Sequence, residues 1–312
     1  MQTVHGIDSF CSLIHEQIIL ALGNFDGVHL GHQEIIRTTV DLAKKKQKKS
    51  AVLIFLPHPL TILSPDCSPY LLITVEDRVR MLSEAGIDYV ILHPFTKEFA
   101  AITPQNFVRE ILTAQLNVAG VVVGYDYSFG HRGSGKTDDL LRLGEECGFF
   151  VRVIPPVTAG GELIGSSAIR KLLGVGAVEK ANQMLGYAYF LRGKVVHGDG
   201  RGHQLGFPTA NLLLPPEIML PANGVYLTQA VISGQTYWSL TNIGRRPTFC
   251  KNDTSVEVHL LDAKKNLYAE ELIVRFLHRM REEKSFADVS SLVKQIKFDI
   301  LTAEKIISCK YT

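Results

Sequence analysis

Apolar runs alternate with amphipathic stretches over the first half of the chain. The short runs are rich in valine, isoleucine and leucine and are typical of buried strands. Between these runs, apolar residues stand three or four positions apart, which is helical spacing. Val75, Val79 and Leu82, which precede Gly86, are an example. This alternation predicts a parallel sheet with helices on its faces. The expected strands are Ile18–Leu22, 51–56, 89–92, 118–123 and 149–154.

The pattern changes at Gly186, after which short alternating runs follow one another without helices between them. Ser233 and Gly234 form an expected hairpin turn between two of these runs. Sequential strands of this kind predict an antiparallel barrel, followed by an amphipathic terminal helix. We therefore expect two domains, residues 1–186 and 187–312. The expected barrel strands are 191–197, 225–232, 235–242, 255–261 and 272–277.

The composition is that of an ordinary globular protein, with 46% apolar residues, 21% charged residues and a formal net charge of +2. This charge gives no electrostatic case for a nucleic-acid binder. The one basic run, residues 44–49, fits a solvated helix end, with an RNA or membrane contact as the alternative. Five scattered cysteines without a CxxC pair argue against disulfides and zinc. Because the sequence shows no signal peptide and no membrane-length apolar run, we expect a cytoplasmic protein.

The segment GNFDGVHLGH carries the strongest chemical signal, because it joins the first expected strand to a helix. A helix N-terminus leaves N–H groups unpaired and carries partial positive charge, so phosphate is its usual guest. His29 and His32 stand three apart, so both imidazoles can face one ligand there and stabilise a phosphoryl-transfer transition state. The spacing is neither a Walker loop nor a dinucleotide fingerprint. The other residues expected to contact the nucleotide here are Gly23, Asn24, Phe25, Asp26 and Gly31.

Two further segments are expected beside this loop, at the edge of the sheet where the parallel strands have their carboxyl ends, because ligands bind there. VVVGYDYSFGHRGSG is dense in glycine and aromatic residues, and a long surface loop is the alternative interpretation. IGSSAIR places Ser166 and Ser167 at a helix start, with Arg170 one turn further on. Serines there usually cap the helix. Together with free N–H groups and a guanidinium, they can also clamp a triphosphate.

The barrel half contains a second constellation, GDGRGHQLGFPTANL. Thr209 and Asn211 stand two apart, so both side chains point to one face of an extended chain, where neutral oxygens and substrate phosphates suit Mg²⁺. Glu257 is the candidate to accept a hydroxyl proton, although without the PTAN motif it would be a solvated strand residue. His259 shares its face and is equally a site neighbour or a plain surface residue. The glycines whose N–H groups could wrap phosphates are Gly198, Gly200, Gly202 and Gly206.

These motifs, in this order, resemble the bacterial bifunctional riboflavin kinase/FMN adenylyltransferase family, also called FAD synthetase. GNFDGVHLGH resembles the GxFDxxHxGH signature of HIGH-type nucleotidyltransferases, which disfavours a glycine turn with incidental histidines. The resemblance covers nearly the whole chain and includes FLPHP, GSSAIR, NIGRRPTF and VEVHLLD. It implies a Rossmann-like adenylyltransferase domain, followed by a six-stranded riboflavin kinase barrel with a C-terminal helix.

The resemblance also implies two ATP-dependent reactions. Riboflavin becomes FMN with release of ADP, and FMN becomes FAD with release of pyrophosphate. In the first domain His29 and His32 match the family's phosphate-binding histidines, and Arg170 matches the arginine of its SSTxIR motif. Asp126 falls where members carry asparagine or aspartate.

In the barrel, the resemblance makes Thr209 and Asn211 the ligands of Mg²⁺ and ATP, and Glu257 the general base. Two residues depart from the family pattern: Gly165 replaces a serine and Ser167 replaces a threonine. These departures put the rate of adenylylation in more doubt than its occurrence. Arg279 and Arg281 match no motif, although they lie near the expected flavin mouth of the barrel.

Two rival functions stay open on the sequence. A pantetheine-phosphate or nicotinamide-nucleotide adenylyltransferase fits the first domain alone, but PTAN and the barrel argue against it. A non-catalytic flavin-binding or RNA-binding regulator could keep the fold. A protein that only binds, however, need not keep a histidine pair, two magnesium ligands and a general base. The expected partners are the small molecules riboflavin, FMN and ATP, with no nucleic acid and no membrane.

Overall fold

The computed structural model describes residues 1–197, 202, 205–245, 254–261, 267–268 and 270–311. The chain divides into two compact units, Met1–Ser166 and Ser167–Thr312. This division falls before the domain boundary expected at residue 186, which stays a prediction. Within the described ranges, no helix is both long and apolar enough to cross a membrane.

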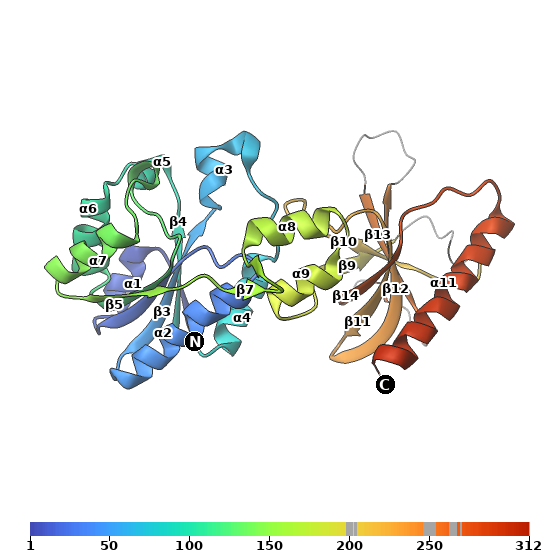
Figure 1. The fold of residues 1–312 in the computed structure, drawn as a ribbon, viewed down its shortest axis with the longest axis horizontal. Helices are drawn as coiled ribbons and strands as arrows, with labels where there is room; N and C mark the ends of the chain where they lie inside the picture. The colour runs from blue at the N-terminus through green and yellow to red at the C-terminus, as the bar shows by residue number, and fades with distance from the viewer. Residues whose placement is uncertain (198–201, 203–204, 246–253, 262–266, 269, 312) are drawn as a thin grey trace. The chain divides into compact units, whose positions relative to one another are not determined.

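A six-stranded parallel sheet forms the centre of the first unit (Figure 1). Its strands are β1 (Gln2–His5), β2 (Ile18–Leu22), β3 (Lys49–Leu56), β4 (Tyr89–Pro94), β5 (Val118–Gly124) and β6 (Phe150–Ile154). They lie in the order β1-β4-β3-β2-β5-β6, and all neighbours are parallel. The chain moves outward in one direction from β2 to β4 and in the other from β5 to β6. The carboxyl ends of β2 and β5 therefore flank a topological switch point, where α/β sheets bind ligands.

The parallel sheet confirms the alternating pattern of the sequence. All five expected strands are present, with bounds within two residues of those predicted. β2 is buried along its whole length, as expected for a strand covered on both faces. β1 was not expected, because Val4 is its one buried residue and a four-residue strand of this kind leaves no apolar run.

Several helical segments of this unit, among them α2, the π-helical segment and α7, cover the sheet through buried apolar residues. The helical segments between the strands are α1 (Ile7–Leu13), α2 (Leu30–Lys45), α3 (Pro59–Leu63), α4 (Val75–Glu84), α5 (Lys97–Ala100), α6 (Pro104–Asn106), a π-helical segment (Phe107–Gln115) and α7 (Thr137–Glu146). Ile18, Leu20 and Leu22 of β2 share one core with α1, the π-helical segment and α7. α2 contacts β2, β3 and β5, and its Ile36 and Val40 are buried. A two-stranded ribbon, β7 (Thr158–Ala159) and β8 (Glu162–Leu163), follows β6.

A closed antiparallel barrel forms the second unit, as the sequence predicts. Its strands are β9 (Phe190–Val196), β10 (Ala210–Leu213), β11 (Gly224–Ile232), β12 (Gln235–Arg245), β13 (Thr254–Leu260) and β14 (Glu271–Arg281). Ser233 and Gly234 have φ of 47° and 82° and form the predicted turn between β11 and β12. β10 was not expected, because it has only four residues and begins two positions after Pro208, so it leaves no long strand pattern in the sequence. It pairs with β9 and β13 and so closes the barrel.

Helices beside the barrel are held partly by two arginines that match no motif. The helices are α8 (Ser166–Gly174), α9 (Val178–Leu185) and α11 (Val289–Lys310). The Arg279 guanidinium of β14 donates to the carbonyl of Val175, the residue after α8, at 3.0 Å and to the Asn223 carbonyl at 3.1 Å. Arg281 donates two nitrogens to the Asp299 carboxylate of α11 at 2.9–3.1 Å. Both arginines therefore have structural roles in the barrel unit.

Candidate active sites

The loop after β2 delivers the signature residues to the start of α2. His29 is the N-cap of that helix, and its Nδ1 accepts the backbone N–H of His32 at 3.3 Å. This bond satisfies one of the N–H groups that a helix start leaves unpaired. Because Nδ1 accepts, the neutral ring carries its proton on Nε2. The His29 imidazole is thus a fixed donor at the positive end of the helix.

The two signature imidazoles stack on each other. Their centroids lie 3.6 Å apart and their planes differ by 15°. Gly31 leaves room for this arrangement, because a Cβ there would lie 3.3 Å from the His29 ring. The buried Phe25 ring lies 5.2 Å from His32 and packs under Gly23, whose Cβ would come within 3.2 Å of it. The structure thus brings His29 and His32 together on a compact support.

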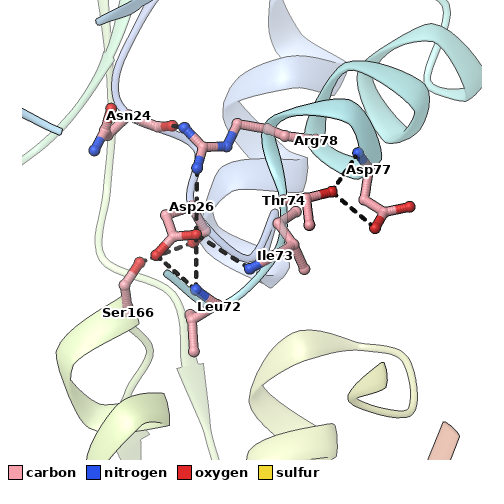
Figure 2. A network of polar contacts seen from close by, with 8 residues as sticks. All are labelled: Asn24, Asp26, Leu72, Ile73, Thr74, Asp77, Arg78 and Ser166. Carbon is pink, nitrogen blue, oxygen red and sulfur yellow. Dashed lines mark hydrogen bonds and ion pairs between the residues drawn. The ribbon is translucent and has the colours of Figure 1, made fainter. Parts of the chain in front are cut away.

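Asn24 and Asp26, two residues apart, face different surroundings (Figure 2). Both polar atoms of the Asn24 side chain are buried and have no hydrogen-bond partner among the described residues. Such atoms are rare in folded proteins, so a ligand is expected to satisfy them. The Asp26 carboxylate instead accepts the backbone N–H of Leu72 at 3.0 Å and lies 3.4 Å from a terminal nitrogen of Arg78. Asp26 therefore binds the protein's own backbone.

A pocket of about 470 Å³ opens at the switch point between Leu22 and Gly124, the last residues of β2 and β5. This volume is that of a small-molecule site. Burial strongly raises the pKa of the phenol of Tyr127, which is one of the lining residues. The aromatic residues of the lining are Phe55, Phe95, Phe99, Phe107, Tyr125, Tyr127 and Phe129. Its polar residues include Asn24, His29, His32, Asp126, Ser128 and Ser166.

The predicted serine and arginine motif begins α8. Ser166 is the first residue of that helix, as the sequence predicts, and its hydroxyl donates to the Asp26 carbonyl at 2.9 Å. Ser167 is exposed, and Arg170 is half-buried one turn further along α8. Gly165 also lines the pocket, and a Cβ there would meet no described atom within 4 Å. Ser166 thus joins the pocket to the signature loop.

In the barrel, Thr209, Asn211 and Glu257 lie together. Asn211 of β10 pairs with Glu257 of β13 in antiparallel register, and the Thr209 hydroxyl donates to Glu257 Oε2 at 3.4 Å. Asn211 is buried, with 7% of its surface exposed. Ser255, on the same face of β13, donates to Glu257 Oε1 at 3.5 Å. Each oxygen of the carboxylate therefore has a hydroxyl group nearby.

Neighbouring residues shape the segment that precedes Thr209. The His259 ring donates from Nδ1 to the Pro208 carbonyl at 2.8 Å and meets the Phe207 ring edge-on, so it is a neighbour of the site. Phe207 donates its N–H to the Gly202 carbonyl at 2.8 Å, and a Cβ at Gly202 would lie 2.5 Å from the Phe207 carbonyl oxygen. Gly206 has a positive φ of 86°. The other two predicted glycines, Gly198 and Gly200, lie outside the described residues.

Comparisons with known proteins decide the family. The FAD synthetase family model matches residues 11–168, and the riboflavin kinase model matches residues 185–307. The bifunctional riboflavin kinase/FMN adenylyltransferase of Listeria monocytogenes is 38% identical, and the alignment covers 90% of each chain. The chain belongs to the bifunctional riboflavin kinase/FMN adenylyltransferase family. The member from Escherichia coli K12 is 35% identical over 98% of this chain and 97% of its own.

Each of the two family models matches a region that contains one candidate site. The region that matches FAD synthetase contains the histidine pair and the aromatic pocket, and the region that matches riboflavin kinase contains Thr209, Asn211 and Glu257. A solved structure from Streptococcus pneumoniae, described as a macrolide-efflux protein, has the same fold. It is 30% identical with a TM-score of 0.88, and the alignment covers all of both chains.

Sequence reasoning missed two features of the first site. One is Arg78, which contacts the signature loop from α4. It lies between Val75, Val79 and Leu82 on the apolar stripe of that helix, so a charge on a buried face was the available signal. The other is the aromatic lining, which comes from segments far apart in the sequence and carries no local pattern.

Proposed function

We propose that the pocket of the first unit transfers the AMP moiety of ATP to FMN. The observation that carries this proposal is the stacked pair of His29 and His32 at the start of α2, beside an aromatic pocket. Imidazole donors at a positive helix end stabilise the charge that develops on a reacting phosphate. Aromatic rings suit the flat ring system of a flavin.

In the proposed reaction an oxygen of the FMN phosphate attacks the α-phosphorus of ATP. The bond from that phosphorus to the β-phosphate oxygen breaks, and pyrophosphate leaves. The attacking phosphate is ionised at neutral pH, so the step needs no strong general base. We assign the stabilisation of charge to His29 and His32, and contacts with the bound substrates to Asn24 and Asp126. The match of Arg170 to the arginine of the family's SSTxIR motif is the support for giving it a part in the same step. No covalent intermediate with the enzyme is required.

We propose that the barrel phosphorylates riboflavin with ATP. Glu257 accepts the proton of the terminal ribityl hydroxyl while the oxygen of that hydroxyl attacks the γ-phosphorus and ADP leaves. Support comes from the position of Glu257 beside the Thr209 hydroxyl and opposite Asn211. The hydroxyls of Thr209 and Ser255 lie 3.4 and 3.5 Å from its two oxygens.

Mg²⁺ fits the same part of the barrel. Thr209 and Asn211 offer neutral oxygens next to a carboxylate, a donor set that suits a hard cation also bound by ATP phosphates. When bound, the ion would neutralise charge on the transferred phosphoryl group. Backbone N–H groups near Gly202 and Gly206 are the proposed contacts for the nucleotide phosphates.

We also propose that the functional boundary lies at residue 186. The riboflavin kinase match, which begins at residue 185, supports this boundary, whereas the compact units divide after Ser166. The proposed partners are riboflavin, FMN and ATP. The proposed compartment is the cytoplasm, which the free thiols of Cys11, Cys147 and Cys309 support.

A chromatographic time course tests both activities in one experiment. Purified protein is incubated with riboflavin, ATP and Mg²⁺, and we expect FMN to appear first and FAD to follow. Formation of FMN without FAD would contradict the proposal for the first unit. Binding of flavin without either product would favour the non-catalytic regulator.

A further inference from the structure

The backbone of the signature loop adopts conformations that side chains rarely take. Phe25, Gly27 and Val28 have φ of 50°, 79° and 33°. Positive φ is unfavourable for residues with a side chain, and most of all for a β-branched residue such as valine. Such a loop keeps its shape only where the surrounding structure over-determines it. The groups that hold this loop therefore control where its functional side chains lie.

A buried arginine from α4 supplies part of that hold (Figure 2). Arg78 is 1% exposed, and one terminal nitrogen donates to the Asn24 carbonyl at 2.9 Å. The other terminal nitrogen lies 3.4 Å from the Asp26 carboxylate, which also accepts the N–H groups of Leu72 and Ile73. One planar guanidinium thus contacts the loop at two positions, which a point charge on a flexible stem cannot reproduce.

Ser166 holds the same loop from another side. Its hydroxyl donates to the Asp26 carbonyl at 2.9 Å, while Arg78 contacts the Asp26 carboxylate (Figure 2). Ser166 also lines the ligand pocket. A shift of Asp26 would therefore move two pocket residues. One is Asn24, which lies two positions earlier in the chain, and the other is Ser166, which is hydrogen-bonded to the Asp26 carbonyl.

Arg78 contacts the loop and lies outside the pocket lining. Among the described residues, the pocket lining includes Asn24, His29 and His32 but neither Asp26 nor Arg78. We propose that Arg78 is a positioning residue for adenylyl transfer, which fixes the backbone from Asn24 to Asp26 before substrates bind. This inference rests on the proposed function of the first pocket. Donors held in place count most in the transition state, so loss of Arg78 is expected to lower kcat more than it raises KM.

The test compares Arg78→Lys and Arg78→Met with the control Arg80→Met. Arg80 lies two residues further along α4, and 52% of its side chain is exposed. We expect Arg78→Met to lower kcat for FMN adenylylation about a hundredfold, the effect of a small displacement of catalytic groups. The KM for FMN and for ATP is expected to change less than about threefold. Arg78→Lys is expected to recover part of the loss, while Arg80→Met keeps normal kinetics.

Riboflavin kinase activity of the same chain is the control for the barrel unit, and near-normal KM values for FMN and ATP are the control for folding of the first unit, which contains Arg78. Normal adenylylation kcat in Arg78→Met, or a change in KM alone, would overturn the inference. If Arg78→Met loses both activities, Arg78→Lys decides, because it keeps a charge beside Asp26. In that variant a loss of kcat confined to adenylylation supports the inference, and a parallel loss of both activities overturns it. Normal Arg78 variants beside an inactive His32→Ala would refute only this inference, whereas a fully active His32→Ala would refute the proposed site itself.

Discussion

At the residue scale, His29 and His32 share one stack but have different local roles. His29 caps α2 through its Nδ1, so its substitution would disturb the helix start as well as any chemistry. His32 is a helical residue in the first turn of α2. Its side chain can therefore be removed with less effect on the local fold, and it is the better test of the proposed charge stabilisation.

We expect His32→Ala to lower the rate of FAD formation from FMN about a hundredfold, because one donor to the reacting phosphate is lost. Riboflavin phosphorylation by the same preparation is expected to stay normal, which controls for the barrel unit, and an unchanged circular-dichroism spectrum controls for folding of the first unit. Both rates are measured by separation of the flavins on a column. An unchanged rate of FAD formation would mean that the loop is only structural.

Gly165 tests the departure from the family motif. Apart from its own backbone and its two chain neighbours, no described atom lies within 4 Å of a Cβ built at this lining residue, so a serine side chain fits. We expect Gly165→Ser to keep its melting temperature and to raise kcat/KM for ATP in adenylylation about two- to tenfold, the effect of one added hydrogen bond. The contrasting variant is Gly120→Ser, whose Cβ would lie 2.2 Å from the Phe150 ring and which is expected to destabilise the protein. A lower melting temperature for Gly165→Ser, or an unchanged kcat/KM, would contradict this view of the pocket.

At the element scale, the sequence predicts the long buried strands and misses the short ones. β2 and β5 are covered on both faces and so read as continuous apolar runs. β1 and β10 have four residues each, and their pairing partners, not their own pattern, make them strands. The omission of β10 matters most, because this strand carries Asn211 and pairs it with Glu257.

The candidate sites were predictable only where motifs carry them. The histidine pair, Thr209, Asn211 and Glu257 could be named from the sequence. The register that puts Asn211 opposite Glu257 could not, because it depends on how the barrel closes. Arg78 could not be assigned a partner, since its contacts with Asn24 and Asp26 span more than fifty residues of chain.

A histidine at the end of β4 links stability to pH. The His93 Nδ1 accepts the N–H of Ile7, the first residue of α1, at 3.2 Å, and burial lowers the pKa of this imidazole below its usual 6.5. The unfolded chain therefore binds the proton more readily. The stabilising contribution of the neutral ring is complete above about pH 6.5 and is lost as the pH falls through the lowered pKa.

We expect the urea midpoint of the wild-type protein to fall more between about pH 7.5 and about pH 5 than that of His93→Gln, which cannot titrate there. His15→Gln, at an exposed histidine, is the matched control and is expected to follow the wild-type curve. Identical pH dependence in the wild-type protein and His93→Gln would contradict the account.

The ion pair between Arg281 of β14 and Asp299 of α11 is expected to hold the terminal helix. Its side chains are 15% and 6% exposed, so Arg281→Met would leave a largely buried carboxylate without its main cation. We expect a loss of about 3 kcal/mol in the free energy of unfolding and faster hydrogen exchange in α11. Arg275→Met, at an exposed position of the same strand, is the control. A loss below about 0.5 kcal/mol would show that the pair is only a surface contact.

At the scale of the whole molecule, one chain carries two sets of catalytic candidates on two separate cores. The first core is built around β2 and the helices that share its face, and the barrel has a core of its own that includes Leu227, Leu240 and Ala303. The histidine pair lies in the first unit, and Thr209, Asn211 and Glu257 lie in the second. The two activities of the family are therefore expected to fail separately when single residues are changed.

The most direct test of this division is the Glu257→Gln variant, assayed once with riboflavin and once with FMN as the starting flavin. Glutamine keeps the shape of the side chain but cannot accept the hydroxyl proton. We expect no FMN from riboflavin and a normal rate of FAD formation from FMN, with His32→Ala giving the opposite result. Normal phosphorylation of riboflavin by Glu257→Gln, or loss of both activities together, would contradict the assignment of one reaction to each unit.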